Sequence, residues 1–327
     1  MRLLLSLLLT LLLTMASAVQ ANYADNPDTK VFIAEMVQKH GFDADKLQAL
    51  FAKAEYKQSI IDAITRPAES KPWHQYRPIF VTQKRIKQGV TFWNEHAETL
   101  ERAEQEFGIP AAIMVAIIGV ETRYGRNTGS YRVMDSLSTL AFNYPKRSKF
   151  FRGQLEHFLL MAREERVDPL LLSGSYAGAM GQPQFIPSSF RSYAIDFDKD
   201  GRRDLWNSTA DVIGSVANYF HRHHWSEGKA IATRAKVRGT LYKPLVKKGY
   251  KPSLTLEQLQ ESGVEPLHSV APESEVALLQ LETRGGHEYW VTLQNFYVIT
   301  RYNHSPLYAM AVFQLSEAIK STRAATN

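Results

Sequence analysis

The chain has 327 residues and no cysteine, which excludes disulfides, thiolate catalysis and cysteine-ligated zinc. Its 39 Lys and Arg residues exceed its 33 Asp and Glu residues by six. This basic balance suits an anionic partner such as cell wall, nucleic acid or anionic lipid, and equally a merely soluble surface, so charge does not choose among them. The length exceeds what one core usually accommodates, so we expect two or three subdomains.

The N-terminus has the pattern of a secretory signal peptide. Met1-Arg2 is a basic start, residues 3–15 form an apolar run, and Ala16-Ser17-Ala18 offers a small-residue cleavage site. The run of 13 residues is too short for a membrane-spanning helix, which needs about 20. We therefore predict a signal peptide over residues 1–21, cleaved after Ala18 or Ala21, and a soluble mature chain. An uncleaved membrane anchor is the alternative.

Apolar residues recur at helical spacing along much of the first third of the chain. The pattern predicts helix from Pro27 to about Ile64 and again from about Lys84 to Phe107. Between these segments, three prolines enclose the aromatic residues 73–77. Helix is disfavoured before each proline, so this stretch is expected to be extended.

An apolar run from Ala111 to Val120 ends at a glutamate, Glu121. The preceding proline favours a helix start, which predicts a helix from about Pro110 to Arg123. Two isoleucines one turn earlier share the face of Glu121, and desolvation by them would raise the pKa of its carboxyl. Such a carboxyl suits a general acid. The helix alone leaves open a glutamate on the solvent side of an ordinary helix end.

Residues 196–206 match the start of an EF-hand loop. Carboxylates stand at loop positions one, three and five, a glycine supplies the sharp turn, and the next residue offers its backbone carbonyl. The ligands predicted on this spacing are Asp196, Asp198, Asp200 and the carbonyl of Arg202. Oxygen ligands suit a hard cation, calcium before magnesium. The alternative is an Asp-rich turn that caps a helix starting at Ser208 or Thr209.

The texture of the chain changes between Ile231 and Val298, where apolar runs are shorter and glycines more frequent. Strands are predicted at 276–281, 289–293 and 297–300, followed by a final amphipathic helix from about Pro306 to Ile319. Basic and aromatic residues mix at 242–251, as they do in nucleic-acid binders. A secreted chain seldom meets nucleic acid, so we expect no such partner.

The predicted fold class is mainly α with a small β-containing insertion (α+β). We expect five parts along the chain. They are the signal peptide over 1–21, an N-terminal helical domain over 22–105, a catalytic core with the EF-hand-like loop over 106–228, a small β-containing subdomain over 229–300, and a C-terminal segment over 301–327 that returns to the helical body.

Two segments together resemble a known family. These are Gly-Val-Glu-Thr at 119–122 and the stretch from Ser175 to Ser189, which contains Ala-Gly-Ala-Met-Gly, Gln-Phe and Pro-Ser-Ser. They look like the B-type lytic murein transglycosylases, also called membrane-bound lytic murein transglycosylase B, which are periplasmic enzymes with a lysozyme-like core. The resemblance runs from about Tyr76 to the C-terminal helix. It implies a periplasmic location, and that Glu121 is the catalytic residue.

The resemblance also implies substrate-binding residues. Those that match the family are Tyr76, Lys146, Arg147, Ser175, Gln184, Tyr219, Tyr302, Asn303 and Tyr308. As bare residues the tyrosines are more often core, the serine and glutamine more often turn formers, and the basic pair more often a solvated surface pair. Pro183 is a departure, because proline removes a backbone donor before Gln184.

The family closes its longer metal loop with a carboxylate beside the next helix, and Asp211 is the candidate here. A structural calcium is therefore implied, with no cofactor for catalysis. Some relatives carry a lipid on a cysteine after the signal sequence, but this chain has no cysteine. No lipid anchor of that kind is expected.

The implied reaction is cleavage of the MurNAc-GlcNAc β-1,4 bond of peptidoglycan with formation of 1,6-anhydromuramyl products. Glu121 acts first as acid and then as base, and the muramyl 6-hydroxyl replaces water. One alternative is a hydrolytic muramidase, which would need a second carboxylate. Another is a non-catalytic, calcium-dependent peptidoglycan-binding protein. The implied partners are peptidoglycan glycan strands, with a cell-wall synthesis or remodelling complex as the kind of assembly the resemblance allows.

Overall fold

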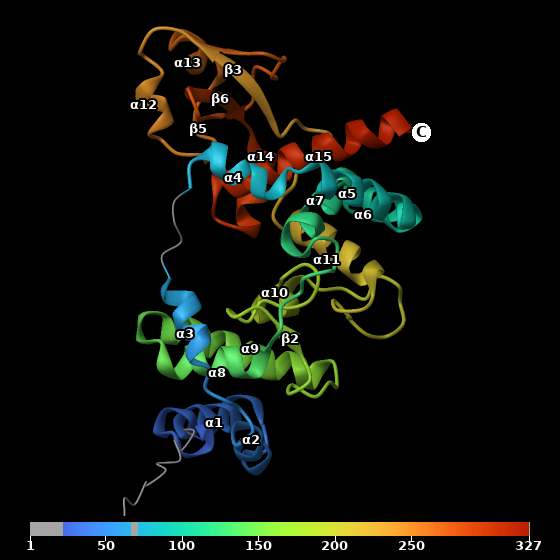
Figure 1. Cartoon of the computed structure of the whole chain (residues 1–327), viewed down its shortest axis with the longest axis vertical. Helices are drawn as coiled ribbons and strands as arrows, with labels where there is room; N and C mark the ends of the chain where they lie inside the picture. Colours follow the sequence, from blue (N-terminus) through green and yellow to red (C-terminus); the bar gives the residue numbers. More distant parts are fainter. Residues whose placement is uncertain (1–21, 67–70, 327) are drawn as a thin grey trace, which may run out of the picture. The chain divides into compact units, whose positions relative to one another are not determined.

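The computed structural model describes residues 22–66 and 71–326 (Figure 1). The chain divides into two compact units, and the division falls between Tyr56 and Lys57. The predicted signal peptide, residues 1–21, lies outside the described residues. The five-part division expected from the sequence stays a prediction.

The first unit is a small helical body. It contains a 3-10 helix at Tyr23–Asp25, α1 (Pro27–His40) and α2 (Ala44–Phe51). Phe32 of α1 and Phe51 of α2 meet edge to face with ring centroids 5.9 Å apart. Asn26 caps α1 by accepting backbone N–H bonds, which satisfies donors that the first turn of a helix leaves free. The predicted helical pattern from Pro27 is confirmed here.

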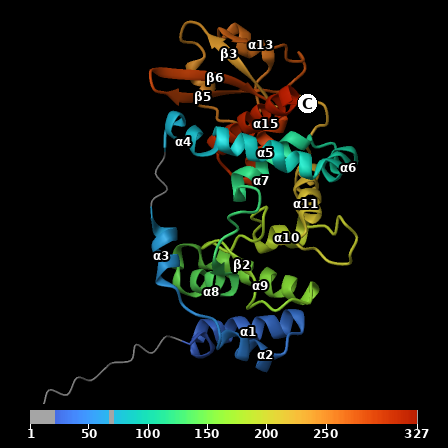
Figure 2. The same cartoon turned by 45° about the vertical axis from the view of Figure 1, so that its right-hand side comes forward.

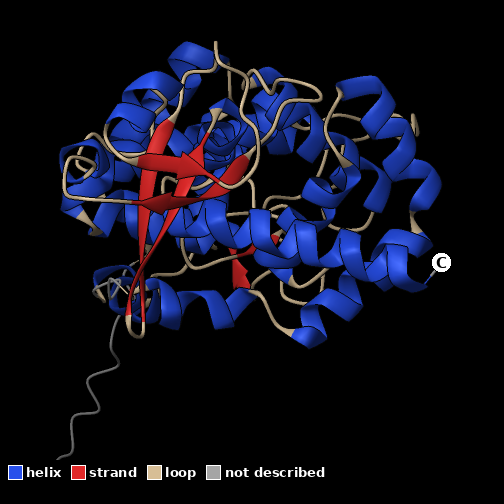
Figure 3. Cartoon of the chain, turned by 90° about the horizontal axis from the view of Figure 1, so that it is seen from above, coloured by secondary structure: helices blue, strands red, loops and turns tan. Residues whose placement is uncertain are grey.

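The second unit is built mainly from helices (Figure 3, blue). Its helices before the sheet are α3 (Gln58–Thr65), α4 (Trp73–Phe80), α5 (Gln83–Glu95), α6 (Ala97–Phe107), α7 (Ala111–Thr122), α8 (Val133–Asn143), α9 (Ser148–Glu164), α10 (Pro187–Tyr193) and α11 (Thr209–Arg222). A 3-10 turn, η2 (Pro145–Arg147), joins α8 to α9, which lie side by side in both views (Figures 1 and 2). The short strands β1 (Tyr131–Arg132) and β2 (Ser173–Gly174) pair antiparallel.

The aromatic stretch at 73–77 corrects an expectation. It is not extended but forms α4, with Pro72 as its N-cap and Pro78 inside the helix. Trp73 is buried and stacks on Tyr76, and Tyr76 in turn meets Phe80 at 5.1 Å between ring centroids. Packing of these rings outweighs the local cost of the internal proline.

Helix α7 lies at the centre of the second unit. Every one of its residues except Glu121 is buried, because alanine, isoleucine, valine and methionine cover all of its faces. It packs against α5, α6 and α11, and against α15 (Pro306–Thr326), the long C-terminal helix (Figures 1 and 2). The predicted helix at 110–123 and the final helix from Pro306 are therefore confirmed.

A four-stranded antiparallel sheet follows α11 (Figure 3, red). Its strands are β3 (Ala232–Val237), β4 (Val264–Pro266), β5 (Ala277–Thr283) and β6 (Gly286–Thr292), in the order β4-β3-β6-β5. The helices α12 (Lys243–Val246) and α13 (Leu256–Glu261) lie in the connection between β3 and β4. Leu254, Leu278 and Val291 belong to the hydrophobic core that this sheet shares with α13.

Two of the three predicted strands are confirmed as β5 and β6. The third, at 297–300, is wrong, because these residues belong to α14 (Gln294–Tyr302). Phe296, Val298 and Ile299 are wholly buried, and a short apolar run of this kind fits a buried helix as well as a strand. The mainly helical α+β class with a small β-containing insertion is confirmed.

Within 22–66 and 71–326, no single helix has the length and hydropathy needed to cross a membrane. By length and composition alone, α6 and α7 pass together as a pair bent by 114°.

Candidate active site

Glu121 is the second-last residue of α7, and the helix ends immediately after it. Arg123, Tyr124 and Gly125 have φ angles of 53°, 61° and 78°, which places three successive residues in the left-handed region. The Arg123 N–H donates to the carbonyl of Gly119, as in a helix C-cap. The turn therefore ends the helix one residue after Glu121 and places this residue in its last turn.

Tyr124 folds back beneath the end of α7. Its hydroxyl donates to the backbone carbonyl of Arg85 on α5 at 2.9 Å. A Cβ at Gly119 or at Gly89 would come within 2.6 Å of the Tyr124 side chain, so both glycines provide space for the ring. The glycine two residues before Glu121 is thus explained by the close approach of Tyr124.

Among the described residues, the Glu121 carboxyl has one hydrogen-bond partner, the hydroxyl of Tyr308 on α15, which donates to Oε1 at 2.5 Å. Burial raises the pKa of Glu121 from 4.5 to about 7, and the hydrogen bond from Tyr308 opposes part of that rise. The residue keeps part of its surface open. It is therefore both poorly solvated and reachable, which is what a group that exchanges protons with a ligand requires.

Two further tyrosines stand close enough to respond to the charge of Glu121. Burial raises the pKa of Tyr76 and, more strongly, that of Tyr302, and the negative charge of Glu121 adds to both shifts. Tyr302 also donates to the carbonyl of Pro183 at 2.6 Å. The structure thus gathers Tyr76, Tyr302 and Tyr308 around Glu121.

Tyr219 lies behind this group. Its ring centroid is 4.8 Å from that of Tyr302, and its hydroxyl donates to the carbonyl of Arg301 at 2.6 Å. It also stacks on His223 at 4.1 Å. The structure thus places Tyr219 as a packing partner of Tyr302.

The stretch from Ser175 to Ser189 is tied to the end of α7. Thr122 donates its hydroxyl to the carbonyl of Gln182 at 2.9 Å, and Met180 and Phe185 pair through backbone hydrogen bonds. The carbonyl of Pro183 accepts the bond from Tyr302. Proline therefore removes a donor at this turn while its acceptor fastens the turn to α14.

Ser175 and Gln184 use their polar groups within this segment and its neighbour. Ser175 Oγ accepts the N–H of Ala179 at 3.0 Å. Gln184 Nε2 donates to the carbonyls of Thr128 and Gly181 at 3.1 and 2.9 Å. These contacts agree with the turn-forming alternative, and a contact with substrate stays a prediction.

Neither Arg147 nor Asn303 forms a hydrogen bond or an ion pair with Glu121. Arg147 lies in η2, where its guanidinium stacks 4.3 Å from the ring centroid of Phe150. Neighbouring Lys146 is exposed. Asn303 is exposed just after α14, and among the described residues its side chain has no hydrogen-bond partner. Substrate-binding roles for Arg147 and Asn303 stay predictions.

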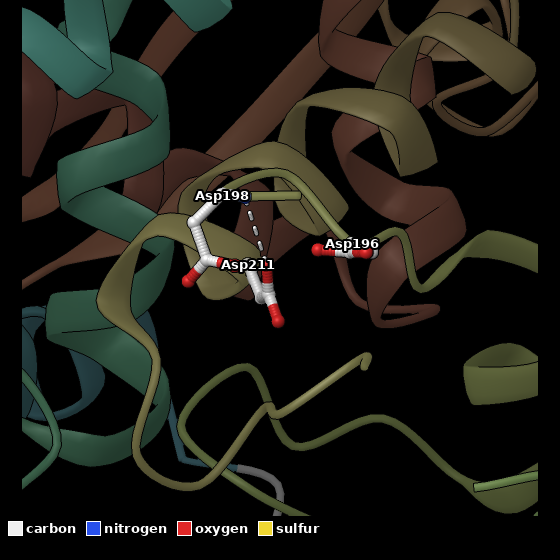
Figure 4. Close-up of side chains that lie close together, drawn as sticks. All are labelled: Asp196, Asp198 and Asp211. Atoms are coloured by element: carbon white, nitrogen blue, oxygen red, sulfur yellow. Dashed lines mark hydrogen bonds between the residues drawn. The ribbon is translucent and has the colours of Figure 1, made fainter. Parts of the chain in front are cut away.

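The acidic loop gathers three carboxylates, those of Asp196, Asp198 and Asp211, which share one space (Figure 4). One oxygen of each lies within 4.8 Å of the others. Asp211 is wholly buried in α11 and accepts N–H bonds from Phe197, Asp198 and Asp204 at 2.7, 3.3 and 2.8 Å. Like charges held this close fit a hard divalent cation that oxygen atoms bind.

The other two predicted ligands make different contacts. The Asp200 carboxylate accepts the N–H of Arg202 at 2.9 Å, and the three carboxylates that the structure groups do not include it. Ser208 caps α11 by accepting the N–H of Asp211, so the helix starts at Thr209 as expected. Asp200 and the Arg202 carbonyl stay predictions as ligands.

Sequence reasoning missed Thr122 and Tyr124, which connect the end of α7 to the rest of the site. Both follow Glu121 directly, within the motif itself. Their partners, Gln182 and Arg85, are far away in the sequence. The only indication in the sequence was therefore that two side chains able to form hydrogen bonds follow the glutamate.

Comparison with known proteins bears on this site. Residues 24–317 match the transglycosylase SLT domain family. The chain is 45% identical over 312 residues to membrane-bound lytic murein transglycosylase B of Escherichia coli (strain K12), covering 92% of this chain and 85% of that protein.

Solved structures agree. Soluble lytic transglycosylase SltB1 from Pseudomonas aeruginosa is 52% identical, with a TM-score of 0.88 over 91% of this chain and all of the other. The Escherichia coli lytic transglycosylase Slt35 in complex with calcium is 45% identical, with a TM-score of 0.86 over 93% of this chain and 96% of the other.

The family match over most of the chain and the fold shared with these structures place the protein in the class of transglycosylases. Within that class, the chain belongs to the family of lytic murein transglycosylases, which are lyases acting on peptidoglycan. The resemblance stated from the two sequence segments is confirmed, and so is the enzyme class.

Proposed function

We propose that this enzyme cleaves the β-1,4 bond between MurNAc and GlcNAc and leaves a 1,6-anhydromuramyl end, with Glu121 acting as acid and then as base. One observation carries the proposal. Glu121 is a poorly solvated carboxyl with a pKa of about 7, and among the described residues its one hydrogen-bond partner is the neutral hydroxyl of Tyr308. At neutral pH it is therefore present in both protonation states, as a group with both roles requires.

In the first step, protonated Glu121 donates its proton to the glycosidic oxygen that leaves. The raised pKa keeps the proton available near pH 7, where an ordinary exposed glutamate would have lost it. The carboxylate that results keeps the hydrogen bond from Tyr308.

In the second step, the Glu121 carboxylate takes the proton of the muramyl 6-hydroxyl. The hydroxyl oxygen then forms a bond to the anomeric carbon, which closes the 1,6-anhydro ring and restores the protonated acid. Because the nucleophile belongs to the substrate, the reaction needs no residue to activate water.

Most glycosidases place two carboxylates about the scissile bond. Here burial and the Tyr308 hydroxyl account for the pKa of Glu121, and among the described residues no neighbouring carboxylate contributes to it. This favours the anhydro product over hydrolysis. The positive charge on the sugar would be stabilised by the substrate's own N-acetyl group or by oriented dipoles such as the tyrosine hydroxyls.

The other predicted positions belong to this proposal as substrate contacts. Tyr76, Tyr302 and Tyr308 adjoin Glu121, whereas Ser175, Gln184, Tyr219, Asn303 and Arg147 would contact the glycan or its peptide further away. Peptidoglycan strands are the proposed substrate, and the periplasm is the proposed location.

We also propose that calcium binds between Asp196, Asp198 and Asp211, with Asp200 and the Arg202 carbonyl as further ligands. The donor set consists of oxygen atoms, and a relative has been solved in complex with calcium. The ion would brace the loop that leads into α11. It takes no part in the chemistry at Glu121.

Mass spectrometry of the products released from purified murein sacculi tests the reaction. Wild type and Glu106→Gln, which alters an exposed glutamate on α6, are expected to release anhydro-muropeptides. Glu121→Gln should keep the fold and lose activity by about a thousandfold or more. Reducing ends from wild type would establish hydrolysis instead, and near-normal activity in Glu121→Gln would remove this residue from the mechanism.

A further inference from the structure

A cavity of about 460 Å³ adjoins the turn that follows Glu121. Four cations line it, Lys84 and Arg85 from α5 and Arg123 and Arg126 from the turn after α7, together with the exposed side chain of Ile79. No acidic residue is among the residues that line it. A second cavity, of about 480 Å³, near the start of α14, is lined by both lysine and glutamate, so its charged residues are of both signs, unlike those of the first.

Arg85 is the informative member of the group. Its residue is only 7% exposed, yet no salt bridge joins it to a carboxylate in the described part of the chain. Its guanidinium donates one bond, to the carbonyl of Ile79 at 3.1 Å, and lies 5.3 Å from the ring centroid of Phe80. Burying a cation without an anionic partner is costly, so this position favours an anion.

The charges nearest to Arg85 add to that cost. Burial lowers the pKa of Arg85, and the positive charge of Arg123 lowers it further. Arg123, Arg126 and Lys84 are exposed, and none of them has an acidic partner among the described residues. Elsewhere in the second unit, arginines such as Arg132 and Arg191 do pair with carboxylates.

The cavity lies next to the candidate active site without including it. Arg123 is two residues after Glu121. Ile79 stands one helical turn after Tyr76 on α4, and Tyr76 responds to the charge of Glu121. A ligand that reaches Glu121 along α4 would therefore pass the four cations.

We propose that this cavity binds carboxylates of the peptide stem carried by the murein strand whose glycan bond is cleaved at Glu121. The inference rests on the proposed function, because it takes the glycan strand to be the substrate. The stem supplies both carboxylates and alanine methyl groups. The cations match the first and the exposed Ile79 side chain matches the second.

This cavity is a different place from the basic pair at Lys146 and Arg147. That pair belongs to η2, between α8 and α9, and Arg147 stacks on Phe150 there. The cavity belongs to α4, α5 and the turn after α7. The enzyme would thus hold the stem peptide close to the reacting bond and on the side of α4.

Binding measured without turnover tests the proposal. In a Glu121→Gln background, affinity is measured by calorimetry for soluble glycan fragments that keep their stem peptides, and for the same fragments after an amidase has removed them. Adding Arg123→Gln and Arg126→Gln together is expected to weaken binding of the peptide-bearing fragments by about tenfold or more. Binding of the peptide-free fragments should stay within about twofold of the parent.

The matched control removes two exposed charges from the β-containing region, by Lys236→Gln and Arg284→Gln, and should leave both affinities unchanged. The proposal would be overturned if affinity fell equally for both kinds of fragment, or if the control variant lost as much affinity. It would also be overturned if peptide-bearing fragments lost none. Two further single variants test whether a loss of binding reflects lost charge or misfolding. Lys84→Gln should weaken peptide-dependent binding, whereas Arg126→Lys, which keeps the positive charge, should largely retain it. If peptide-dependent binding holds but wild type releases no anhydro ends, the proposed function fails and the cavity assignment stands.

Discussion

Glu121 and Asp211 are both carboxyls in poorly solvated surroundings, and burial raises the pKa of each. They differ in their hydrogen-bond donors and their neighbours. Glu121 has one donor, the neutral hydroxyl of Tyr308, whereas Asp211 accepts three backbone N–H groups and faces Asp196 and Asp198.

The difference suits the two carboxyls to the opposite tasks proposed for them. With a single neutral donor, burial dominates and the carboxyl holds a proton near neutral pH. Three fixed N–H groups oppose that effect, and a second acidic group nearby makes a cation the favoured partner. Donor number therefore separates the proposed proton carrier from the proposed cation ligand, since burial raises the pKa of both.

Breaking the acidic cluster is expected to have the largest effect on stability. A ligand present at about a thousandfold its dissociation constant adds about 4 kcal/mol to the free energy of unfolding, so chelation of calcium should lower Tm strongly. Asp211→Asn should abolish the rise of Tm with calcium concentration. The control Asp168→Asn, an exposed position outside the loop, should respond as wild type does. A wild-type Tm that is independent of calcium would contradict the metal assignment.

Replacing Glu121 should make stability depend on pH in a defined direction. Its pKa is about 7 in the folded protein against an ordinary 4.5. The contribution of protonated Glu121 to the free energy of unfolding is therefore fully present below about pH 4.5. It is lost as the pH rises through 7. Glu121→Gln should gain stability relative to wild type between pH 4.5 and 8.5, by on the order of 3 kcal/mol.

Urea unfolding at several pH values measures this difference. Glu106→Gln provides the control, because its exposed carboxyl should give no comparable trend. If the stability difference between Glu121→Gln and wild type were the same at pH 4.5 and 8.5, the raised pKa of Glu121 would be refuted.

Removing the single donor to Glu121 should have a smaller effect. The hydrogen bond from Tyr308 lowers the pKa of Glu121, so Tyr308→Phe should raise it further and move the alkaline limb of the rate profile to higher pH. We expect about a tenfold loss of rate at neutral pH, the value of one hydrogen bond to a charged group. Tyr219→Phe, whose hydroxyl bonds to Arg301 instead, should leave that limb in place.

Much of the helical framework could be predicted because its signals are local. The buried residues of α5 and α6 recur at helical spacing, and Pro110 marks the start of the apolar helix α7 within one residue. Where side-chain packing decides the structure, the local rules failed. Trp73 and its ring partners hold α4 helical despite Pro78, and buried Val298 and Ile299 lie in a helix rather than a strand.

The same division applies to the candidate sites. Loop spacing predicted that Asp196 and Asp198 would meet, and the resemblance added Asp211. The partnership of Glu121 with Tyr308 joins residues 187 positions apart, so no spacing rule could show it. For the same reason the sequence could not predict that Arg85 is buried without an acidic partner, since only the structure shows that it forms no salt bridge with a described carboxylate.

Under the proposed mechanism, the separation of Glu121 and Tyr308 along the chain also sets when the enzyme can become active. A chain still being synthesised holds α7 long before α15 exists, so its Glu121 lacks both the Tyr308 hydroxyl and the surroundings that exclude water. It is then an ordinary carboxylate, which at neutral pH carries no proton to donate. Under the proposed mechanism, a partly made or partly unfolded chain therefore lacks the proton donor, and folding of the last helix completes the site.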